Sequence, residues 1–320
     1  MIDVLNLTKD FDDFRAVDAV SFSVSRGQVL GFLGPNGAGK STSMKMITGY
    51  LRPTSGTAHI GGIDICHDPL AAQKLMGYLP EGAPAWPDMT PRQFLEFITR
   101  IRGMDKAASR QAMGQAVETT ELHGVLDQPI DTLSKGFRRR VGLAQAIVHD
   151  PDILIMDEPT DGLDPNQKHQ VRAAIKEMAR AKAIIISTHI LEEVDAICTR
   201  AMIIDRGRVI VEGTPSALAA RSAYHGAVVV TVASAVAGAF GTHLETLSGV
   251  RAESEIRGEE TIFHVLNDPT SADTPTALFA KVQALVEQKS DGVIGLALDA
   301  GRLDDVFRDL TRGADAELSL

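Results

Sequence analysis

The sequence predicts an α/β domain over residues 1–215 and a small α+β domain over residues 222–320. Up to about Gly213, short apolar runs alternate with segments of helical periodicity, which is the pattern of strands covered by helices. Between about residues 90 and 150 helical spacing predominates, which indicates a helical insertion. A second set of strands and helices follows Gly213, so a separate smaller fold is expected there.

The composition agrees with two soluble domains. The 320 residues exceed one typical core, and 44% hydrophobic with 23% charged residues is ordinary globular material. A net charge of −10 argues against a broad nucleic-acid footprint. Cys66 and Cys198 lie far apart without metal-ligand spacing, so we expect reduced thiols without a role. The N-terminal residues lack the pattern of a signal peptide.

The elements of the first domain follow from its apolar runs. Residues 29–33, 153–156 and 183–186 are continuously apolar, as in strands covered on both faces. Residues 41–49 have helical spacing, and residues 201–210 are typical of a hairpin.

The second region predicts a βαββαβ order with a closing helix. The strands are expected at 227–232, 250–255, 261–266 and 293–298, and the helices at 236–246, 276–288 and 303–310. No Lys, Arg, Asp or Glu occurs between Arg221 and Glu245, yet the stretch is mainly Ala, Gly and Val with several polar residues. We therefore interpret it as a strand and a helix rather than a membrane span. If the protein works at a membrane, another chain must span it.

A glycine-rich run directly after the first apolar strand predicts a phosphate-binding loop. It fits G-x-x-x-x-G-K-[ST] at every fixed position and leads into a helix, which is the context that such a loop needs. Glycines let backbone N–H groups surround phosphate oxygens, and the helix N-terminus adds partial positive charge. The residues expected at the nucleotide are Gly34, Pro35, Asn36, Gly37, Ala38, Gly39, Lys40, Ser41 and Thr42. Lys40 should reach the β- and γ-phosphates, and Ser41 should bind Mg²⁺.

Two carboxylates follow the apolar strand at 153–156. Asp157 is placed to hold Mg²⁺ through its water shell, and Glu158 can polarise a water for attack on the γ-phosphate. Acidic residues also end many strands without any such role, and this alternative becomes weaker beside a phosphate-binding loop.

Further motifs follow in order along residues 1–215. They are Phe11, Gly77-Tyr78-Leu79-Pro80-Glu81, Leu133-Ser134-Lys135-Gly136-Phe137, Gly162-Leu163-Asp164-Pro165 and Ser187-Thr188-His189. Together with the phosphate loop and Asp157-Glu158, this part of the chain resembles the ATP-binding subunit of an ABC transporter. The motifs resemble that family's adenine-stacking aromatic, Q-loop, signature, D-loop and switch histidine.

The resemblance implies a P-loop NTPase fold: a RecA-like core with an antiparallel β subdomain and a helical insertion. It also implies that two such domains dimerise head to tail around two ATP molecules, as a homodimer or a heterodimer. Ser134 and the backbone at Gly136 would then bind the γ-phosphate from the opposite subunit, and Asp164 is expected at the nucleotide. His189 would contact the γ-phosphate, although a histidine after a strand is often only structural. Catalysis is expected from Glu158, His189 and Lys40, with ATP and Mg²⁺ bound.

The chain departs from the family pattern at several positions. Lys135 and Phe137 replace a glycine and a glutamine of the signature, while Ser134 and Gly136 are kept. Glu81 replaces the usual glutamine, and we expect it to ligate Mg²⁺ through oxygen.

Phe11 replaces the commoner tyrosine, and stacking needs only the ring. Phe14 is a nearby competitor for the same role. Trp86 follows the Q-loop, where it could be an exposed contact for a partner or a core residue. We expect residues 138–140, all arginine, to face solvent, the phosphates or a partner, because the chain is acidic.

The end of the chain suggests a subclass. Residues 301–311 resemble the ending of ATPases that serve ABC-2 type permeases, which are mostly exporters. The resemblance thus implies an ATPase on the cytoplasmic face of the membrane that powers a separate permease, with no nucleic acid. The alternative is a soluble regulatory or ribosome- or DNA-associated ABC ATPase. Against the ribosome- or DNA-associated alternative, the chain has one phosphate-loop motif, no heptad run and an acidic balance.

Overall fold

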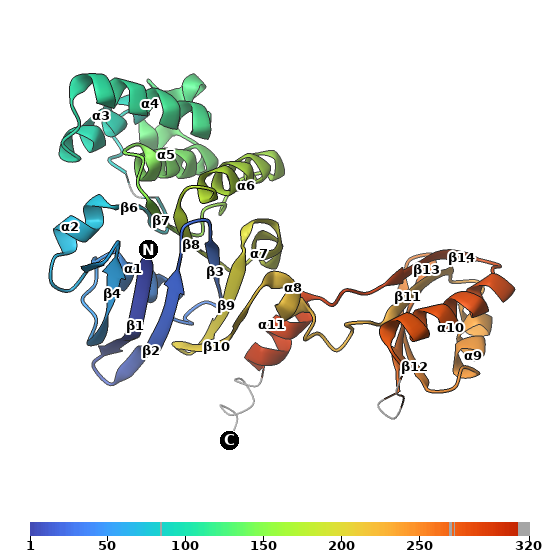
Figure 1. Cartoon of the computed structure of the whole chain (residues 1–320). Helices are drawn as coiled ribbons and strands as arrows, with labels where there is room; N and C mark the ends of the chain where they lie inside the picture. Colours follow the sequence, from blue (N-terminus) through green and yellow to red (C-terminus); the bar gives the residue numbers. More distant parts are fainter. Residues whose placement is uncertain (84, 269–270, 272, 313–320) are drawn as a thin grey trace. The chain divides into compact units, whose positions relative to one another are not determined.

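The computed structural model describes residues 1–83, 85–268, 271 and 273–312 (Figure 1). The chain divides into two compact units, Met1–Pro215 and Ser216–Leu320. Residues 313–320 of the predicted second domain lie outside the described residues.

The first unit is built on a six-stranded sheet with the order β10-β9-β3-β8-β7-β6. Its strands are β3 (Val29–Leu33), β6 (Met76–Leu79), β7 (Ile153–Asp157), β8 (Ala183–Thr188), β9 (Arg200–Asp205) and β10 (Arg208–Gly213). All neighbours are parallel except β9 and β10, which form the predicted hairpin. Every residue of β3, β7 and β8 is buried, so their continuous apolar runs are explained and confirmed. The carboxyl ends of parallel strands share one edge, where the motif loops begin.

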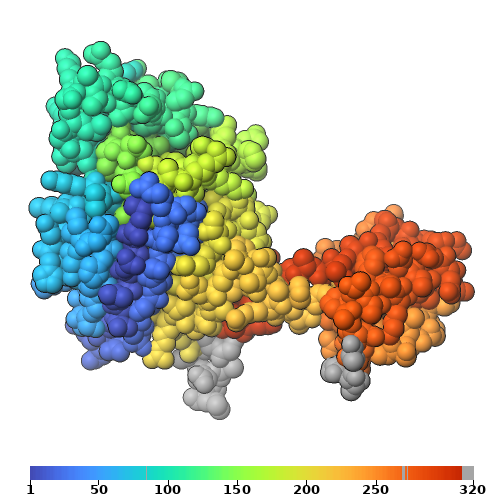
Figure 2. Space-filling model, in the orientation of Figure 1, coloured from blue at the N-terminus to red at the C-terminus, as the bar shows by residue number. Residues whose placement is uncertain are grey.

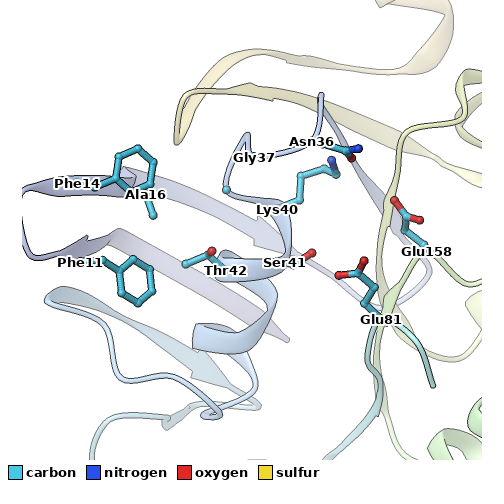
Figure 3. A pocket seen from close by; sticks show the side chains of 11 residues that line it. Phe11, Phe14, Ala16, Asn36, Gly37, Lys40, Ser41, Thr42, Glu81 and Glu158 are labelled. Atoms are coloured by element: carbon cyan, nitrogen blue, oxygen red, sulfur yellow. The ribbon is translucent and has the colours of Figure 1, made fainter. Parts of the chain in front are cut away.

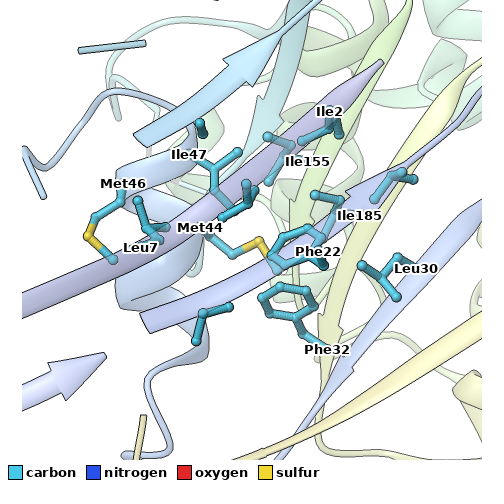
Figure 4. Close-up of a cluster of buried hydrophobic side chains, with 14 of the residues drawn as sticks. Ile2, Leu7, Phe22, Leu30, Phe32, Met44, Met46, Ile47, Ile155 and Ile185 are labelled. Carbon is cyan, nitrogen blue, oxygen red and sulfur yellow. The ribbon is translucent and has the colours of Figure 1, made fainter. Parts of the chain in front are cut away.

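A four-stranded antiparallel sheet, β2-β1-β4-β5, completes the first unit. Its strands are β1 (Ile2–Phe11), β2 (Phe14–Val24), β4 (Ser55–Ile60) and β5 (Ile63–Asp64). Side chains from both sheets and from helix α1 (Lys40–Ile47) form one core (Figure 4). Within it Phe22 and Phe32 meet edge to face with centroids 5.0 Å apart. This packing fixes the loop between β3 and α1.

The predicted helical insertion is confirmed, and it has a core of its own. Its elements are α3 (Pro91–Ile101), α4 (Lys106–Thr120), the short 3₁₀ turns η1 (His123–Val125) and η2 (Ile130–Thr132), and α5 (Lys135–Ile147). Leu95, Val117 and Val141 bring the three α-helices together. Thr90 begins α3 with a capping box that satisfies two orphan N–H groups. Figure 2 shows this green region at one end of the first unit.

Three more helices complete the first unit. These are α2 (Pro69–Lys74), α6 (Pro165–Ala179) and α7 (Leu191–Ile197). Asp164 begins α6 by accepting a hydrogen bond from the N–H of Gln167 (2.9 Å).

The second unit has the predicted βαββαβ order, arranged as a split βαβ fold. It contains β11 (Val228–Ala233), α9 (Ala237–Glu245), β12 (Val250–Arg257), β13 (Glu260–Asn267), α10 (Pro275–Gln288), β14 (Val293–Leu298) and α11 (Leu303–Arg312). A short helix, α8 (Pro215–Ala219), precedes them. The sheet is antiparallel in the order β12-β13-β11-β14, and Val230, Phe263 and Val282 lie in its core.

The uncharged stretch after Arg221 forms β11 and α9, as interpreted from its composition. Over the described part of the chain, no helix combines the length and the apolar character needed to cross a bilayer.

Candidate active site

A pocket of about 390 Å³ opens over the loop between β3 and α1 (Figure 3). It is lined by Phe11, Phe14, Ala16, Asn36, Gly37, Gly39, Lys40, Ser41, Thr42, Glu81 and Glu158. In Figure 3 the two phenylalanines lie on one side of Lys40 and Ser41, and the two glutamates lie on the other. The pocket thus has an aromatic end and an acidic end, with the phosphate-loop motif between them.

The glycines of the loop are required by its geometry. Gly37 and Gly39 adopt φ values of 81° and 99°, which favour glycine, and Gly39 caps α1 in the left-handed conformation. A Cβ on Gly34 would lie 2.3 Å from the carbonyl oxygen of Ile204. The loop therefore approaches its neighbours too closely for a side chain at Gly34 and at Gly39, whereas Gly37 has open space and needs glycine only for its φ.

Lys40 is buried within its own loop. Its Nζ donates to the carbonyl oxygens of Gly34 (2.7 Å) and Pro35 (3.0 Å). Burial lowers the pKa of this ammonium group, while the carboxylates of Glu158, Asp157 and Glu81 act in the opposite direction.

Asp157 has the property expected of a metal ligand. Its side chain is 1% exposed, and its Oδ1 accepts a hydrogen bond from the Ser187 hydroxyl. Its Oδ2 is buried and has no hydrogen-bond partner among the described residues. An anionic oxygen left unpaired in the interior is costly, and a cation or its bound water would satisfy it. Asp157 therefore fits a Mg²⁺ site.

The chain alone does not complete a metal site. Within the described ranges no group of three or more His, Cys, Asp or Glu side chains could hold a metal ion. Mg²⁺ is commonly held by one or two carboxylates together with substrate phosphates. Ser41 and Glu81, which line the pocket, are the further oxygen donors on this side.

Glu158 is held in an unusual backbone conformation and bonded to His189. Its φ is 50°, and its N–H group lies 3.1 Å from the carbonyl and 3.2 Å from the hydroxyl oxygen of Ser187. His189 Nδ1 lies 2.8 Å from Glu158 Oε1. An ionised carboxylate only accepts, so Nδ1 carries the proton of this bond. Positive φ at a glutamate costs on the order of 1–3 kcal/mol and is typical of functional sites.

The signature residues lie outside the pocket. Ser134 caps α5, since its Oγ accepts from the N–H of Phe137 (3.3 Å), and Lys135 Nζ pairs with Asp161 Oδ2 (2.8 Å). Of the described residues predicted at the nucleotide or its metal, Gly34, Pro35, Ala38, Ser134, Gly136, Asp157, Asp164 and His189 do not line the pocket. The first three belong to the loop itself, whereas the others lie at strand ends, on other loops or at helix ends.

The expectation for the three arginines is wrong at two positions. Arg138 is exposed, but Arg139 and Arg140 are only 5% and 7% exposed. Both guanidinium groups donate to backbone carbonyls, which makes their burial tolerable. Gly136, Arg139 and Leu143 share the helical spacing of one buried face, and this spacing was the signal that could have revealed Arg139.

The aromatic alternatives are resolved in part. Trp86 is 52% exposed, yet its ring packs edge to face on Phe97 (4.9 Å) and Phe94 (5.9 Å) of α3. It is therefore a surface residue anchored on the helical insertion. Phe11 and Phe14 are paired across the β1–β2 hairpin and both line the pocket.

Comparisons with known proteins agree with this geometry. Residues 17–161 match the family described as "ABC transporter". The chain is 39% identical over 218 residues to a Nod factor export ATP-binding protein I from Burkholderia orbicola, covering 68% of this chain and 72% of that protein. It is 34% identical over 315 residues to the protein of the same name from Ralstonia nicotianae, covering 97% and 94%. A solved ATP-binding subunit of an ABC transporter is 28% identical with a TM-score of 0.64, covering 68% and 91%.

The fold and the site define a P-loop nucleotide-binding domain. The chain belongs to the ABC transporter family and is an ATP-binding, ATP-hydrolysing subunit of that family. The relatives are named as subunits of exporters, which favours transport over a soluble regulatory or ribosome- or DNA-associated ATPase.

Proposed function

We propose that this chain hydrolyses ATP to power export through a separate ABC-2 type membrane permease. The observation that carries the proposal is the pocket in which the phosphate loop faces Glu81 and Glu158. The export function is supported by the relatives' names and by the resemblance of residues 301–311 to permease-linked ATPases.

Residues 34–42 hold the phosphates of ATP in this proposal. Lys40 leaves the loop carbonyls and donates to the β- and γ-phosphates, which are stronger acceptors because they are charged. The N-terminus of α1 adds its dipole. Phe11 stacks on the adenine, and Phe14 is the competing residue at the same end of the pocket.

Ser41, Asp157 and Glu81 would hold Mg²⁺ together with phosphate oxygens. When bound, it neutralises the charge that develops on the phosphates during transfer. Asp157 Oδ2 is the oxygen available for this purpose, because Oδ1 is engaged by Ser187.

Glu158 accepts a proton from the water that attacks the γ-phosphate. The bond from His189 Nδ1 orients the carboxylate of Glu158, and a His189 ring that is also protonated on Nε2 would donate to a phosphate oxygen. Lys40 and His189 thus surround the reacting phosphate from two sides, in their predicted catalytic roles.

A second ATPase domain completes the site. Ser134, Gly136 and Asp164 do not line the pocket of their own chain, so they are assigned to the nucleotide of a second copy or of a paralogue. The N-terminus of α5 at Ser134 suits a phosphate there.

The two units divide the work in this proposal. Residues 1–215, with a helical subdomain at about 90–150, form the ATPase domain, and residues 222–320 form an accessory domain. The protein is peripheral on the cytoplasmic face of the membrane, where the half-exposed Trp86 is a contact candidate for the permease.

The test of the catalytic assignment is Glu158→Gln. We expect turnover to fall by on the order of 10²–10⁴ while ATP affinity is kept, because the amide cannot accept the proton. Steady-state hydrolysis and calorimetry with ATP measure the two quantities. Glu192→Gln, an exposed carboxylate in α7, is the matched control. Turnover close to that of the unaltered protein would remove Glu158 from this role.

A further inference from the structure

Arg139 bonds to two chain segments beside the pocket, although it does not line the pocket itself. It projects from the buried face of α5 and is 5% exposed. Its Nη2 donates to the carbonyl oxygens of Asp157 and Glu158, and its Nη1 donates to the carbonyl oxygen of Pro80 (3.0 Å). Pro80 directly precedes Glu81, so one guanidinium group contacts the backbone of both acidic segments.

The bonds of Arg139 complete the restraint on Glu158. On one side the N–H of Glu158 donates to Ser187 of β8, and on the other side its carbonyl accepts from Arg139. The residue between these bonds has φ of 50°, which an isolated glutamate would leave. Bonds at both ends of the residue therefore maintain a conformation that the backbone does not favour by itself.

The charges around Arg139 also link this residue to the acidic end of the pocket. Burial lowers the pKa of its guanidinium group, but Asp161, Asp157, Glu158 and Glu81 act against this change. An arginine remains charged under these conditions. The carboxylates of Asp157, Glu158 and Glu81 act on Lys40 as well. Two buried cations therefore balance the negative charge at the acidic end of the pocket. Lys40 can reach phosphate, and Arg139 is held by backbone carbonyls.

We propose that Arg139 is a positioning residue that holds Glu158 and Glu81 in their reactive placement and ties both to the signature helix. This inference rests on the proposed function, because it assigns Arg139 an effect through Glu158. The planar fork of arginine matches three acceptors on two separate loops, whereas an ammonium group cannot hold all three in one plane.

The neighbouring arginines provide matched controls on the same helix. Arg138 is exposed, and its Nη1 donates a long hydrogen bond to the Asp131 carbonyl (3.4 Å). Arg140 is buried like Arg139, but it contacts the carbonyls of Thr120 and Glu121 and the ring of Phe137, all within the helical insertion. Arg140→Met therefore reports the cost of losing a buried arginine without touching the acidic loops.

The experiment uses the full chain with Arg139→Met, Arg139→Lys, Arg138→Met and Arg140→Met. Hydrolysis is measured against ATP and against free Mg²⁺, and ATP affinity is measured separately by calorimetry. Arg139→Met should lower kcat by roughly 10- to 100-fold and raise the Mg²⁺ concentration needed for half-maximal rate, with ATP affinity changed less than threefold. Arg139→Lys should recover part of kcat, and Arg138→Met should match the unaltered protein.

A cycle with Glu158→Gln separates this inference from the proposed function. If Arg139 acts through Glu158, Arg139→Met should lower the residual turnover of the Glu158→Gln protein by less than twofold. An equal fold-loss in both backgrounds would overturn the inference, as would Arg139→Met and Arg140→Met behaving alike. Should Arg139→Met fail to fold, the same comparison is made with Arg139→Lys. Normal turnover in Glu158→Gln alone would instead refute the role of Glu158.

Discussion

Lys40 and Asp157 show at the scale of single residues why the pocket is suited to a charged ligand. The ammonium group of Lys40 is buried against neutral carbonyls, and Asp157 Oδ2 is buried with no donor among the described residues. Each group would gain from a partner of opposite charge. ATP with Mg²⁺ supplies both partners, which connects the burial of these two side chains to binding.

Lys40→Ala should therefore weaken nucleotide binding. Loss of a charge-assisted hydrogen bond costs roughly 1.5–3 kcal/mol, or roughly 10- to 100-fold in affinity. Calorimetry with a non-hydrolysable ATP analogue measures the change. Lys45→Ala, an exposed lysine in the last turn of the same helix, is the control and should bind as the unaltered protein does. Equal affinity of the Lys40 variant and this control would contradict the assignment of the loop.

His149 gives a prediction for pH. Burial and, to a lesser extent, the charge of Arg102 lower its pKa from 6.5 to about 4. Its Nε2 lies 3.1 Å from the carbonyl of Met76, and the neutral ring can donate this bond. As pH falls from 6.5 towards 4, His149 binds a proton in the unfolded chain but stays neutral in the folded chain. The free energy of unfolding should therefore decrease over this range and be highest above it.

His149→Gln should remove part of this acid sensitivity, because glutamine can donate the same bond without titrating. Urea unfolding at pH values between 4 and 7 measures it, with the exposed His169→Gln as control. If both variants lose stability with acid as steeply as the unaltered protein, His149 does not carry the effect.

At the scale of elements, close packing between α5 and β6 depends on glycine. A Cβ on Gly77 of β6 would lie 1.9 Å from the carbonyl of Ala146 in α5, which is backbone and cannot give way cheaply. A Cβ on Gly142 of α5 would lie 2.6 Å from that of Ala83. Helix α5, which begins at the signature, therefore packs closely against β6, the strand that leads to Glu81.

Gly77→Ala should destabilise the first unit by about 1–3 kcal/mol or more, because the clash forces α5 away from β6. Gly114→Ala is the matched control: it lies in α4 with nothing near its Cβ, and it should stabilise by about 1 kcal/mol. Urea denaturation of both variants tests the pair. Equal free energies of unfolding for the two variants would show that α5 and β6 are not closely packed at Gly77.

Prediction from sequence succeeded for the strands of the six-stranded sheet and failed for two buried arginines, Arg139 and Arg140. The strands β3, β7 and β8 were predictable because their apolar runs are buried on both faces. The phosphate loop and Glu158 were predictable because their chemistry requires those residues beside a strand end. The burial of Arg139 could have been inferred from its helical spacing with Gly136 and Leu143, but its acceptors could not, because the carbonyl of Pro80 belongs to a residue distant in sequence. The pattern of side chains in a sequence does not indicate which backbone carbonyls are available to accept a hydrogen bond.

At the scale of the whole molecule, the two units have separate hydrophobic cores. We therefore expect two unfolding transitions in scanning calorimetry. ATP added to the Glu158→Gln protein should raise the midpoint temperature of the first unit's transition and leave that of the second unit unchanged. A ligand at 100 times its Kd stabilises the folded state that binds it by about 2.7 kcal/mol. A single transition that shifts as a whole would show that the units unfold cooperatively.

The central claim is that this ATPase works on a membrane permease, and the most direct measurement is capture of its partner. Tagged Glu158→Gln protein is recovered from detergent-solubilised native membranes with and without ATP, and the bound proteins are identified and counted. The account predicts one integral membrane protein in stoichiometric amount with the ATPase. Recovery of ribosomes or DNA, or of the ATPase alone under both conditions, would contradict it.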